Sequence, residues 1–339
     1  MVLRILIDAM GGDNAPGAIV QGAVTAAAEF GAEVVLVGRE AEVRECLERC
    51  GGGKRVSVVN ADEVITMEDD PSTATRRKKN SSMSLALQML HQGEGDACVS
   101  AGSTGALLSG ATLTVRRIPG IRRACFAPVV PNGERGVIIA DCGANAECTA
   151  EYLLQFAYMG SFYSQEILGC DAPRVGLLNI GTEESKGTAL QKETHALLTQ
   201  AEVEGRLRFV GNVEPTQLLS GQVDVVVCDG FSGNVLLKSV EGTAGFLMNR
   251  LKKTLTRSTA NKLAALVLRK DLGELKALLD VSEVGGTPLL GLTRPVIKAH
   301  GSSDARAIRS AVKQAIACVE ADVCGRIEKN IAQMRIKNT

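Results

Sequence analysis

Two polar residues lie at positions from which their side chains could contact an anionic ligand. Lys186 lies in NIGTEESKG, just before a predicted helix, and Asn234 lies in DGFSGN, where a buried strand gives way to a helical pattern. The helix dipole disfavours a cation at a helix start, so a bound anion would explain Lys186, and a solvated lysine explains it equally well. Asn234 either caps the helix that follows Gly233 or donates its amide to a developing oxyanion. The residues alone leave both questions open.

Small-residue loops between strands and helices form the second candidate feature. Six times, a β-branched run is followed by a loop rich in Gly, Ser, Asn and Asp and then by a helical period. Backbone N–H groups at such helix starts bind anions, and glycines let a ligand come close. The residues predicted to bind phosphate or substrate there are Asp8, Gly11, Gly12, Asp13, Ser103, Thr104, Gly105, Asn145, Gly181, Gly230, Ser232 and Gly233.

Other chemistries find less support. His300 stands at a strand end in KAHGSSDA and is a third catalytic candidate, although a structural role suits a histidine at a helix entry. The sequence has no G-x-S-x-G, G-x-G-x-x-G or P-loop pattern, so a serine nucleophile and nucleotide cradles lack support. Inorganic phosphate, already anionic at pH 7, is a nucleophile that needs little activation. The ten cysteines are scattered without C-x-x-C, so no zinc site is predicted. The loop aspartates Asp8, Asp13, Asp141 and Asp229 could hold Mg²⁺ or equally anchor turns, and no metal ligand is assigned.

The elements that must position these residues alternate between strand and helix, which predicts an α/β fold with a mainly parallel sheet in a Rossmann-like three-layer αβα arrangement. The chain of 339 residues then forms a single α/β domain, 1–339, or two lobes. In CFAPVVPNGERGVIIADC, Asn132 and Gly133 predict a two-residue hairpin turn, so the sheet is expected to be mixed. Loops at the carboxyl ends of parallel strands line the ligand crevice, so the six loops should converge on one face.

Residues 245–280 have a different residue pattern from the rest of the chain and are predicted to form a basic amphipathic helical insertion. Leucines recur there at helical spacing, and positions 250–280 contain eight basic residues and three acidic ones. Such helices contact a subunit or an anionic membrane surface, or form a solvated pair on their own domain. The residues predicted to make carrier-protein or membrane contact are Arg250, Lys252, Lys253 and Arg257 here, and the run Arg76, Arg77, Lys78 and Lys79 before a helix capped within residues 80–82.

The amino-acid composition limits the classes of partner and the cellular location that we expect. The 38 basic and 38 acidic residues cancel, aromatics make up 3% of the chain and Trp is absent, so nucleic acid is not an expected partner. The N-terminus enters a strand at once, and no later stretch has the length and apolarity of a membrane span. We therefore expect a cytoplasmic protein with reduced cysteines.

The motifs, taken together, resemble a known family. DAMGGDNAP, EDDPSTATRRKKNSSM, SAGSTGALL, DCGAN, NIGTEESKG, GNVE, DGFSGNVLLK, GGTPLLG and KAHGSS occur in the order found in the bacterial phosphate acyltransferase family PlsX, over roughly residues 1 to 330. The resemblance implies a fold similar to phosphotransacetylases and isopropylmalate dehydrogenases, a homodimer, and transfer of a fatty acyl group from acyl carrier protein to inorganic phosphate for phospholipid synthesis. It also implies peripheral membrane association, with the downstream glycerol-3-phosphate acyltransferase as a further partner.

What the resemblance implies about the site narrows the open questions. The lysine of its ESKG motif and the asparagine of its GFxGN motif are the family's catalytic candidates, and they fall on Lys186 and Asn234. No cofactor is implied, because the phosphopantetheine arm arrives on the carrier protein. Residues 284–287 read Val-Gly-Gly-Thr, where members often have Tyr before the double glycine and Ala after it, which bears on acyl-chain preference. The alternatives are a phosphotransacetylase-like enzyme using acyl-CoA, a dehydrogenase of similar fold, and a non-catalytic membrane-associated scaffold.

Overall fold

A computed structural model describes residues 2–279 and 285–335 and divides the strands between two sheets. The seven-stranded sheet has the order β3 (Val56–Asn60), β2 (Glu33–Gly38), β1 (Arg4–Asp8), β4 (Ala97–Ser100), β12 (Val296–Lys298), β11 (Thr287–Leu290) and β5 (Cys125–Phe126). The five-stranded sheet has the order β6 (Val129–Val130), β7 (Val137–Ala140), β10 (Val225–Val227), β8 (Arg174–Leu178) and β9 (Arg208–Val213). The α/β class is confirmed, and two sheets take the place of one.

Both sheets are mixed and mainly parallel, as predicted. In the first, β3, β2, β1, β4 and β12 run parallel, and β11 pairs antiparallel with both β12 and β5. In the second, only β6 runs antiparallel, against β7. Strands β4, β7 and β10 are buried along their whole length, which explains their continuous apolar sequence.

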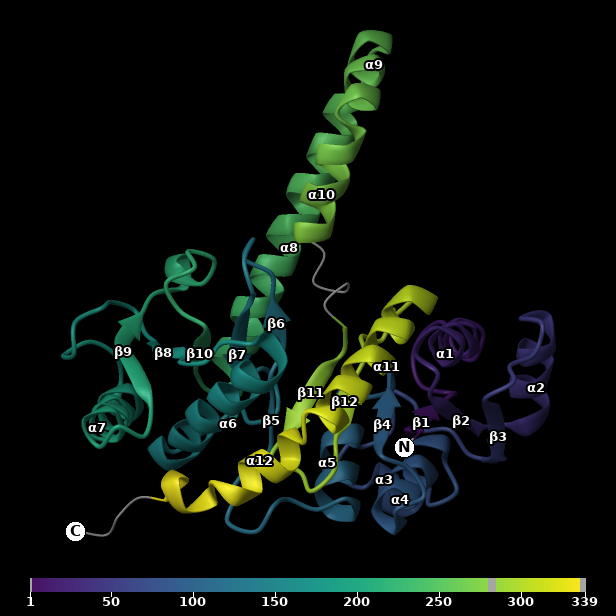
Figure 1. Cartoon of the computed structure of the whole chain (residues 1–339), viewed down its shortest axis with the longest axis horizontal. Helices are drawn as coiled ribbons and strands as arrows, with labels where there is room; N and C mark the ends of the chain where they lie inside the picture. Colours follow the sequence, from purple (N-terminus) through teal and green to yellow (C-terminus); the bar gives the residue numbers. More distant parts are fainter. Residues whose placement is uncertain (1, 280–284, 336–339) are drawn as a thin grey trace.

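Helices cover both faces of the sheets (Figure 1). On the first sheet, α1 (Gly17–Phe30) and α11 (Ala305–Glu320) pack together on one face, while α4 (Ser82–Gln92) and α5 (Thr104–Thr114) pack together on the other, beside the short α3 (Ala74–Arg77). Helix α2 (Glu40–Arg49) joins β2 to β3. On the second sheet, α6 (Ala150–Leu168) and α7 (Ala189–Val203) lie opposite the first turns of α8 (Gly230–Leu255). Helix α12 (Val323–Lys329) packs against α6 and α11.

The predicted two-residue hairpin turn is wrong. The pairing of Val130 with Val137 leaves six residues, 131–136, between β6 and β7. The Asn132 side chain accepts hydrogen bonds from the backbone N–H groups of Glu134 and Gly136, at 3.0 Å each, and so stabilises a wider loop. A side chain that bonds its own backbone in this way competes with the tight turn that its residue type otherwise favours.

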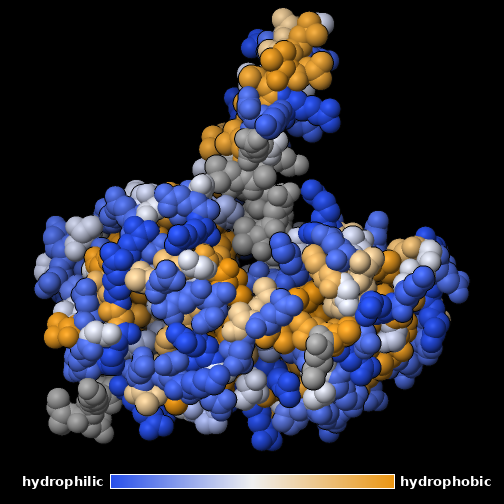
Figure 2. Space-filling model, in the orientation of Figure 1, coloured by the Kyte–Doolittle hydropathy of each residue, from blue (hydrophilic) through white to orange (hydrophobic). Residues whose placement is uncertain are grey.

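Helices occupy the described part of the predicted insertion, and the first of them begins before position 245. Helix α8 runs without a break from Gly230 to Leu255, and α9 (Thr259–Val267) and α10 (Arg269–Leu279) return beside it. The resulting hairpin projects from the body, as Figure 1 shows, and Figure 2 shows hydrophobic and hydrophilic patches side by side on it. Residue 280, the last of the predicted segment, lies outside the described residues. Among the helices described, none has both the length and the apolarity to cross a bilayer.

Candidate active site

The loops after β1, β4 and β12 meet at the carboxyl ends of these three strands, which are neighbours in the first sheet, as predicted. The loops after β1 and β12 are joined by a hydrogen bond of 2.8 Å from the Asp13 N–H to the Gly301 carbonyl. The Asn14 side chain donates to the carbonyls of Ser302 and Ser303 at 3.1 and 3.2 Å. Two glycine positions admit no larger residue: a Cβ on Gly11 would lie 2.5 Å from the Asp8 carboxylate, and Gly12 has a φ of 102°. These glycines serve the packing of loop on loop.

Beneath these loops lie a buried acid, Asp8, and a half-buried base, Lys298. Asp8 accepts a hydrogen bond of 2.7 Å from the Ser100 hydroxyl, and burial raises the pKa of its carboxyl above the ordinary value. Lys298, at the end of β12, donates from its Nζ to the carbonyls of Ala101, at 3.2 Å, and Ala299. Burial lowers the pKa of Lys298 to about 8, against the opposing influence of Asp8 and Asp13. Lys298 was missed from the sequence, although a lone lysine ending the apolar run VIK was a usable signal.

The loop after β7 is built around the carboxylate of Asp141. This carboxylate accepts hydrogen bonds from the backbone N–H groups of Phe126, Cys142, Ala144 and Asn145, at 2.6 to 3.3 Å. Burial raises the pKa of Asp141 to about 6, although these hydrogen bonds act in the opposite direction. The amide nitrogen of Asn145, a predicted ligand contact, is engaged by the Ala124 carbonyl at 2.8 Å and by Asp141 at 3.0 Å. The loop therefore has a fixed shape before any ligand binds.

The turn between β10 and α8 docks onto this loop. The Gly230 N–H donates to the Asn145 carbonyl at 2.7 Å, and a Cβ on Gly233 would lie 2.0 Å from the Asp141 carbonyl oxygen. Glycines three residues apart share one face of a helix, so both let the first turn of α8 touch the loop. The predicted ligand contacts Gly230 and Gly233 therefore have a packing role here.

Asn234 does not cap this helix, so that interpretation is wrong. The N-cap is Asp229, whose carboxylate accepts from the N–H and the hydroxyl of Ser232, both at 2.8 Å. Asn234 lies in the second turn, exposed, with its side chain facing the Gly143 backbone of the Asp141 loop. The Asn234 Oδ1 would lie 3.7 Å from a Cβ built on Gly143, and the second interpretation, oxyanion binding, stays a prediction.

Lys186 lies on the loop after β8, the strand next to β10. Its carbonyl accepts a hydrogen bond of 3.2 Å from the Asn179 side chain, its stem packs over Gly181, and its side chain is exposed. The helix that follows is capped by Thr188, with a capping box to Gln191. Lys186 is thus beside a helix start, as predicted.

A cleft of about 820 Å³ lies between the two sheets and brings several predicted residues together. Asp13, Thr104 and His300 come from the first sheet's loops, and Asn234 comes from the second. The cleft wall also holds Phe126, Pro128, Cys142, Leu237, Lys238, Glu241, Met248, Lys298 and Ser303, and Lys186 is not one of its lining residues. Five of the six predicted loops thus supply the face, with the loop of Lys186 to one side.

His300 is held at the cleft by its own loop and by α8. Its Nδ1 lies 2.8 Å from the Ser302 hydroxyl and accepts from the Ser302 N–H at 3.2 Å. Its Nε2 lies 3.5 Å from the Nζ of Lys238, which in turn pairs with Glu241 at 2.7 Å. Lys238 and Glu241 are further cleft residues that sequence reasoning missed, because on a helix of unknown orientation they look like solvated charges.

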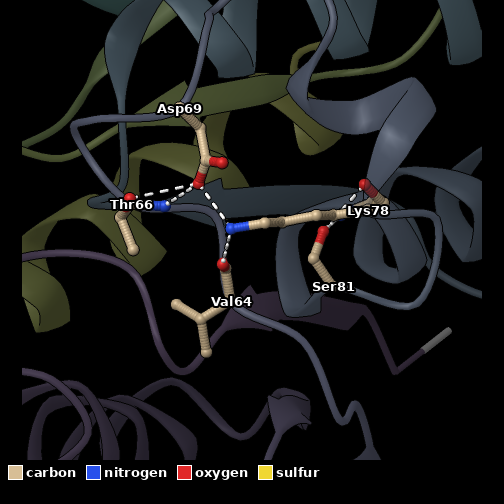
Figure 3. A network of polar contacts seen from close by, with 6 residues as sticks. Val64, Thr66, Asp69, Lys78 and Ser81 are labelled. Atoms are coloured by element: carbon tan, nitrogen blue, oxygen red, sulfur yellow. Dashed lines mark hydrogen bonds and ion pairs between the residues drawn. The ribbon is translucent and has the colours of Figure 1, made fainter.

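The remaining predicted residues have other surroundings. Ser103 caps α5 by accepting from the Ala106 N–H at 3.5 Å, and a Cβ on Gly105 would lie 2.7 Å from Pro71. In the basic run, Lys78 donates from its Nζ to Asp69 at 2.6 Å and to the Val64 carbonyl at 2.9 Å (Figure 3). The residues of the two basic groups with exposed side chains are Arg76, Arg77, Lys79, Arg250, Lys252, Lys253 and Arg257.

The Lys78 ammonium group therefore binds within the protein, whereas carrier-protein or membrane contact was predicted for it. Arg76 and Arg77 occupy the last turn of α3, where the helix dipole favours cations. Within residues 2–279 and 285–335, no three His, Cys, Asp or Glu side chains are grouped so that they could hold a metal ion.

Comparison with solved structures gives the class of fold. A phosphotransacetylase from Streptococcus pyogenes superposes with a TM-score of 0.62 at 19% identity, covering 95% of this chain and 94% of the other. A 4-hydroxythreonine-4-phosphate dehydrogenase from Klebsiella pneumoniae superposes with a TM-score of 0.55 at 13% identity, covering 94% of this chain and 100% of the other. The chain thus has the α/β fold of the phosphotransacetylases, which such dehydrogenases share.

Sequence comparison gives the family. The fatty acid synthesis protein family matches residues 3–326. The phosphate acyltransferase of Geobacillus thermodenitrificans is 49% identical over 331 residues, 97% of this chain and 99% of the relative. That of Oceanobacillus iheyensis is 48% identical over 330 residues, 97% of each chain. The chain belongs to this family, the PlsX phosphate acyltransferases, and is an enzyme of that class.

Proposed function

We propose that this enzyme moves a fatty acyl group from the thioester of an acyl carrier protein to inorganic phosphate, giving an acyl phosphate for phospholipid synthesis. A phosphate oxygen attacks the thioester carbonyl carbon, the carbon–sulfur bond breaks, and the thiolate of the carrier's phosphopantetheine arm leaves and takes up a proton. The observation that carries the proposal is the cleft between the sheets, where Asn234 faces loops with the character of an anion site.

The cations and N–H groups of the cleft suit phosphate. Lys298 is protonated at pH 7 because its pKa is about 8, whereas the charge of Lys238 at the cleft wall is balanced by Glu241, its partner at 2.7 Å. The N-terminus of α5, at Thr104, points its dipole toward the same space. These groups hold phosphate against the thioester, and holding two reactants in place is a large part of any bimolecular rate enhancement.

The amide of Asn234 is our proposed donor to the tetrahedral oxyanion, and Lys186 is proposed to pair with phosphate or with that oxyanion from the neighbouring loop. Lys186 does not line the cleft, so its support comes from its place on the loop after β8, the strand next to β10, and from the family motif. Removing one donor to an oxyanion costs about 10² to 10³ in kcat.

We further propose that the hairpin of α8, α9 and α10 contacts a membrane surface or a second copy of the chain. Its support is a set of exposed apolar side chains beside the basic ones: Phe246, Leu247, Leu263, Leu266, Val267, Leu268 and Leu275. An apolar face flanked by cations is what an interfacial helix presents to anionic lipid. Homodimer formation, and contact with the downstream glycerol-3-phosphate acyltransferase, are proposals on the same ground.

A comparison of acyl donors tests the main proposal against its alternatives. Purified enzyme is incubated with phosphate and either palmitoyl carrier protein or palmitoyl-CoA, and the acyl phosphate formed is trapped with hydroxylamine. We expect kcat/KM to be higher with the carrier protein. A preference for palmitoyl-CoA would favour the phosphotransacetylase-like alternative. If neither donor gives acyl phosphate, the non-catalytic scaffold is the alternative that remains.

A further inference from the structure

The cleft extends from the proposed reaction site along one face of α8. The α8 residues that line it are Asn234, Leu237, Lys238, Glu241, Ala244, Gly245 and Met248. These positions recur every three or four residues, so they form one continuous stripe. From Asn234 to Met248 the helix rises about 21 Å, at 1.5 Å per residue.

The character of this stripe changes along its length. Asn234 is polar, the charges of Lys238 and Glu241 are paired with each other at 2.7 Å, and the three residues that follow have no polar side-chain group. Across the cleft, Phe126, Pro128 and Ala307 add apolar walls. Between Gly245 and Met248, on faces of α8 that do not line the cleft, Phe246 and Leu247 are 62% and 53% exposed. A polar start and an apolar continuation suit a ligand with a reacting head and a hydrocarbon tail.

We propose that this stripe of α8 is the binding groove for the acyl chain, and that the absence of a side chain at Gly245 lets chains of about sixteen carbons lie in it; the inference rests on the proposed function. An extended chain with bonds of about 1.5 Å advances about 1.3 Å per carbon, so sixteen carbons span about 20 Å. This length matches the rise from Asn234 to Met248. The groove directs the tail of the product toward the hairpin.

Gly245 offers a direct way to shorten the groove. A Cβ built on Gly245 meets no atom within 4 Å, so a larger side chain enters open space of the cleft. Gly245 lies about 16 Å along the helix from Asn234, at 1.5 Å per residue, which corresponds to a chain of about twelve carbons. A phenylalanine there should therefore block a sixteen-carbon chain and spare an eight-carbon one.

The same helix supplies a matched control. Gly242 also has open space around its Cβ but does not line the cleft. Replacing either glycine removes a poor helix former from a helix interior, so neither Gly245→Phe nor Gly242→Phe should lower the thermal unfolding midpoint.

The experiment measures kcat/KM with octanoyl and palmitoyl carrier protein for wild type, Gly245→Phe and Gly242→Phe. A fully buried methylene contributes about fourfold to affinity and a methylene in an open cleft about twofold, so loss of four costs at least about tenfold. We expect the palmitoyl-to-octanoyl ratio to fall at least about tenfold in Gly245→Phe alone.

Two results would overturn the groove while the reaction stands: an unchanged ratio in Gly245→Phe, or an equal loss with both donors. A fall in the ratio for Gly242→Phe as well would assign the effect to the hairpin and also overturn it. If wild-type enzyme turns over neither donor with phosphate, the proposed function itself fails.

Discussion

A single methyl group at Gly233 should separate α8 from the loop that it packs on. In Gly233→Ala, the new Cβ would lie 2.0 Å from the Asp141 carbonyl oxygen and 2.8 Å from the Cys228 sulfur. The first of these neighbours is backbone, in a loop held by four N–H donors to the Asp141 carboxylate, so it cannot turn aside as a flexible side chain would.

The magnitude follows from two opposing effects. Alanine is favoured over glycine in a helix interior by about 1 kcal/mol. Overpacking a tightly packed site costs about 1 to 3 kcal/mol and more where backbone must move. We expect Gly233→Ala to lower the free energy of unfolding by about 2 kcal/mol and to displace Asn234, the next residue.

Gly242→Ala on the same helix is the control, because its Cβ meets nothing within 4 Å. That substitution should raise the free energy of unfolding by up to about 1 kcal/mol. The assay is urea unfolding followed by far-UV circular dichroism, with acyl phosphate formation measured in parallel. Equal effects of the two substitutions, or full activity in a stable Gly233→Ala, would refute the packing argument.

Three further predictions concern charge and exposed surface. Between pH 8 and 10.5 the unfolded chain holds a proton at Lys298 that the folded chain, with a pKa of about 8, has lost. We therefore expect the free energy of unfolding of wild type, minus that of Lys298→Met, to rise with pH across that window. Urea titrations at several pH values measure this difference, and a difference that falls with pH would contradict the burial of the Lys298 amine. Lys78→Met should lower the urea midpoint because it removes the partner of Asp69, whereas Lys79→Met at an exposed position should not; equal midpoints would show that the Lys78 contacts contribute nothing. Leu247→Ser should weaken co-sedimentation with anionic vesicles while acyl phosphate formation from octanoyl carrier protein is kept, and unchanged sedimentation would remove the hairpin from membrane contact.

The sequence predicted the elements better than their assembly. Strands and helices were recognisable because each βαβ unit repeats a short apolar run, a small-residue loop and a helical period. Division into two sheets was not predictable in the same way, because pairing joins distant segments, such as β4 with β12, that carry no local mark. Asn132 and Gly133 have the residue types of a two-residue turn, yet the Asn132 side chain bonds the backbone of a longer loop.

The candidate site was predicted in part for a similar reason. Glycine-rich loops and Asn234 are visible in sequence, since unusual residue types at a strand end mark them. Lys238, Glu241 and Lys298 were missed because a charged residue on a helix or at a strand end looks solvated until the opposite wall of the cleft is known. Gly230 and Gly233 were singled out as ligand contacts, and the close approach that they allow in the structure is to the Asp141 loop.

The most direct test of the proposed acyl transfer to phosphate measures the release of free thiol from palmitoyl carrier protein, with and without phosphate. Wild type, Asn234→Ala and Lys186→Ala are measured side by side. We expect wild type to release thiol only when phosphate is present, and each variant to keep its fold while its kcat falls about 10²- to 10³-fold. Release without phosphate would contradict the reaction. Undiminished release by either variant would contradict the role proposed for that residue.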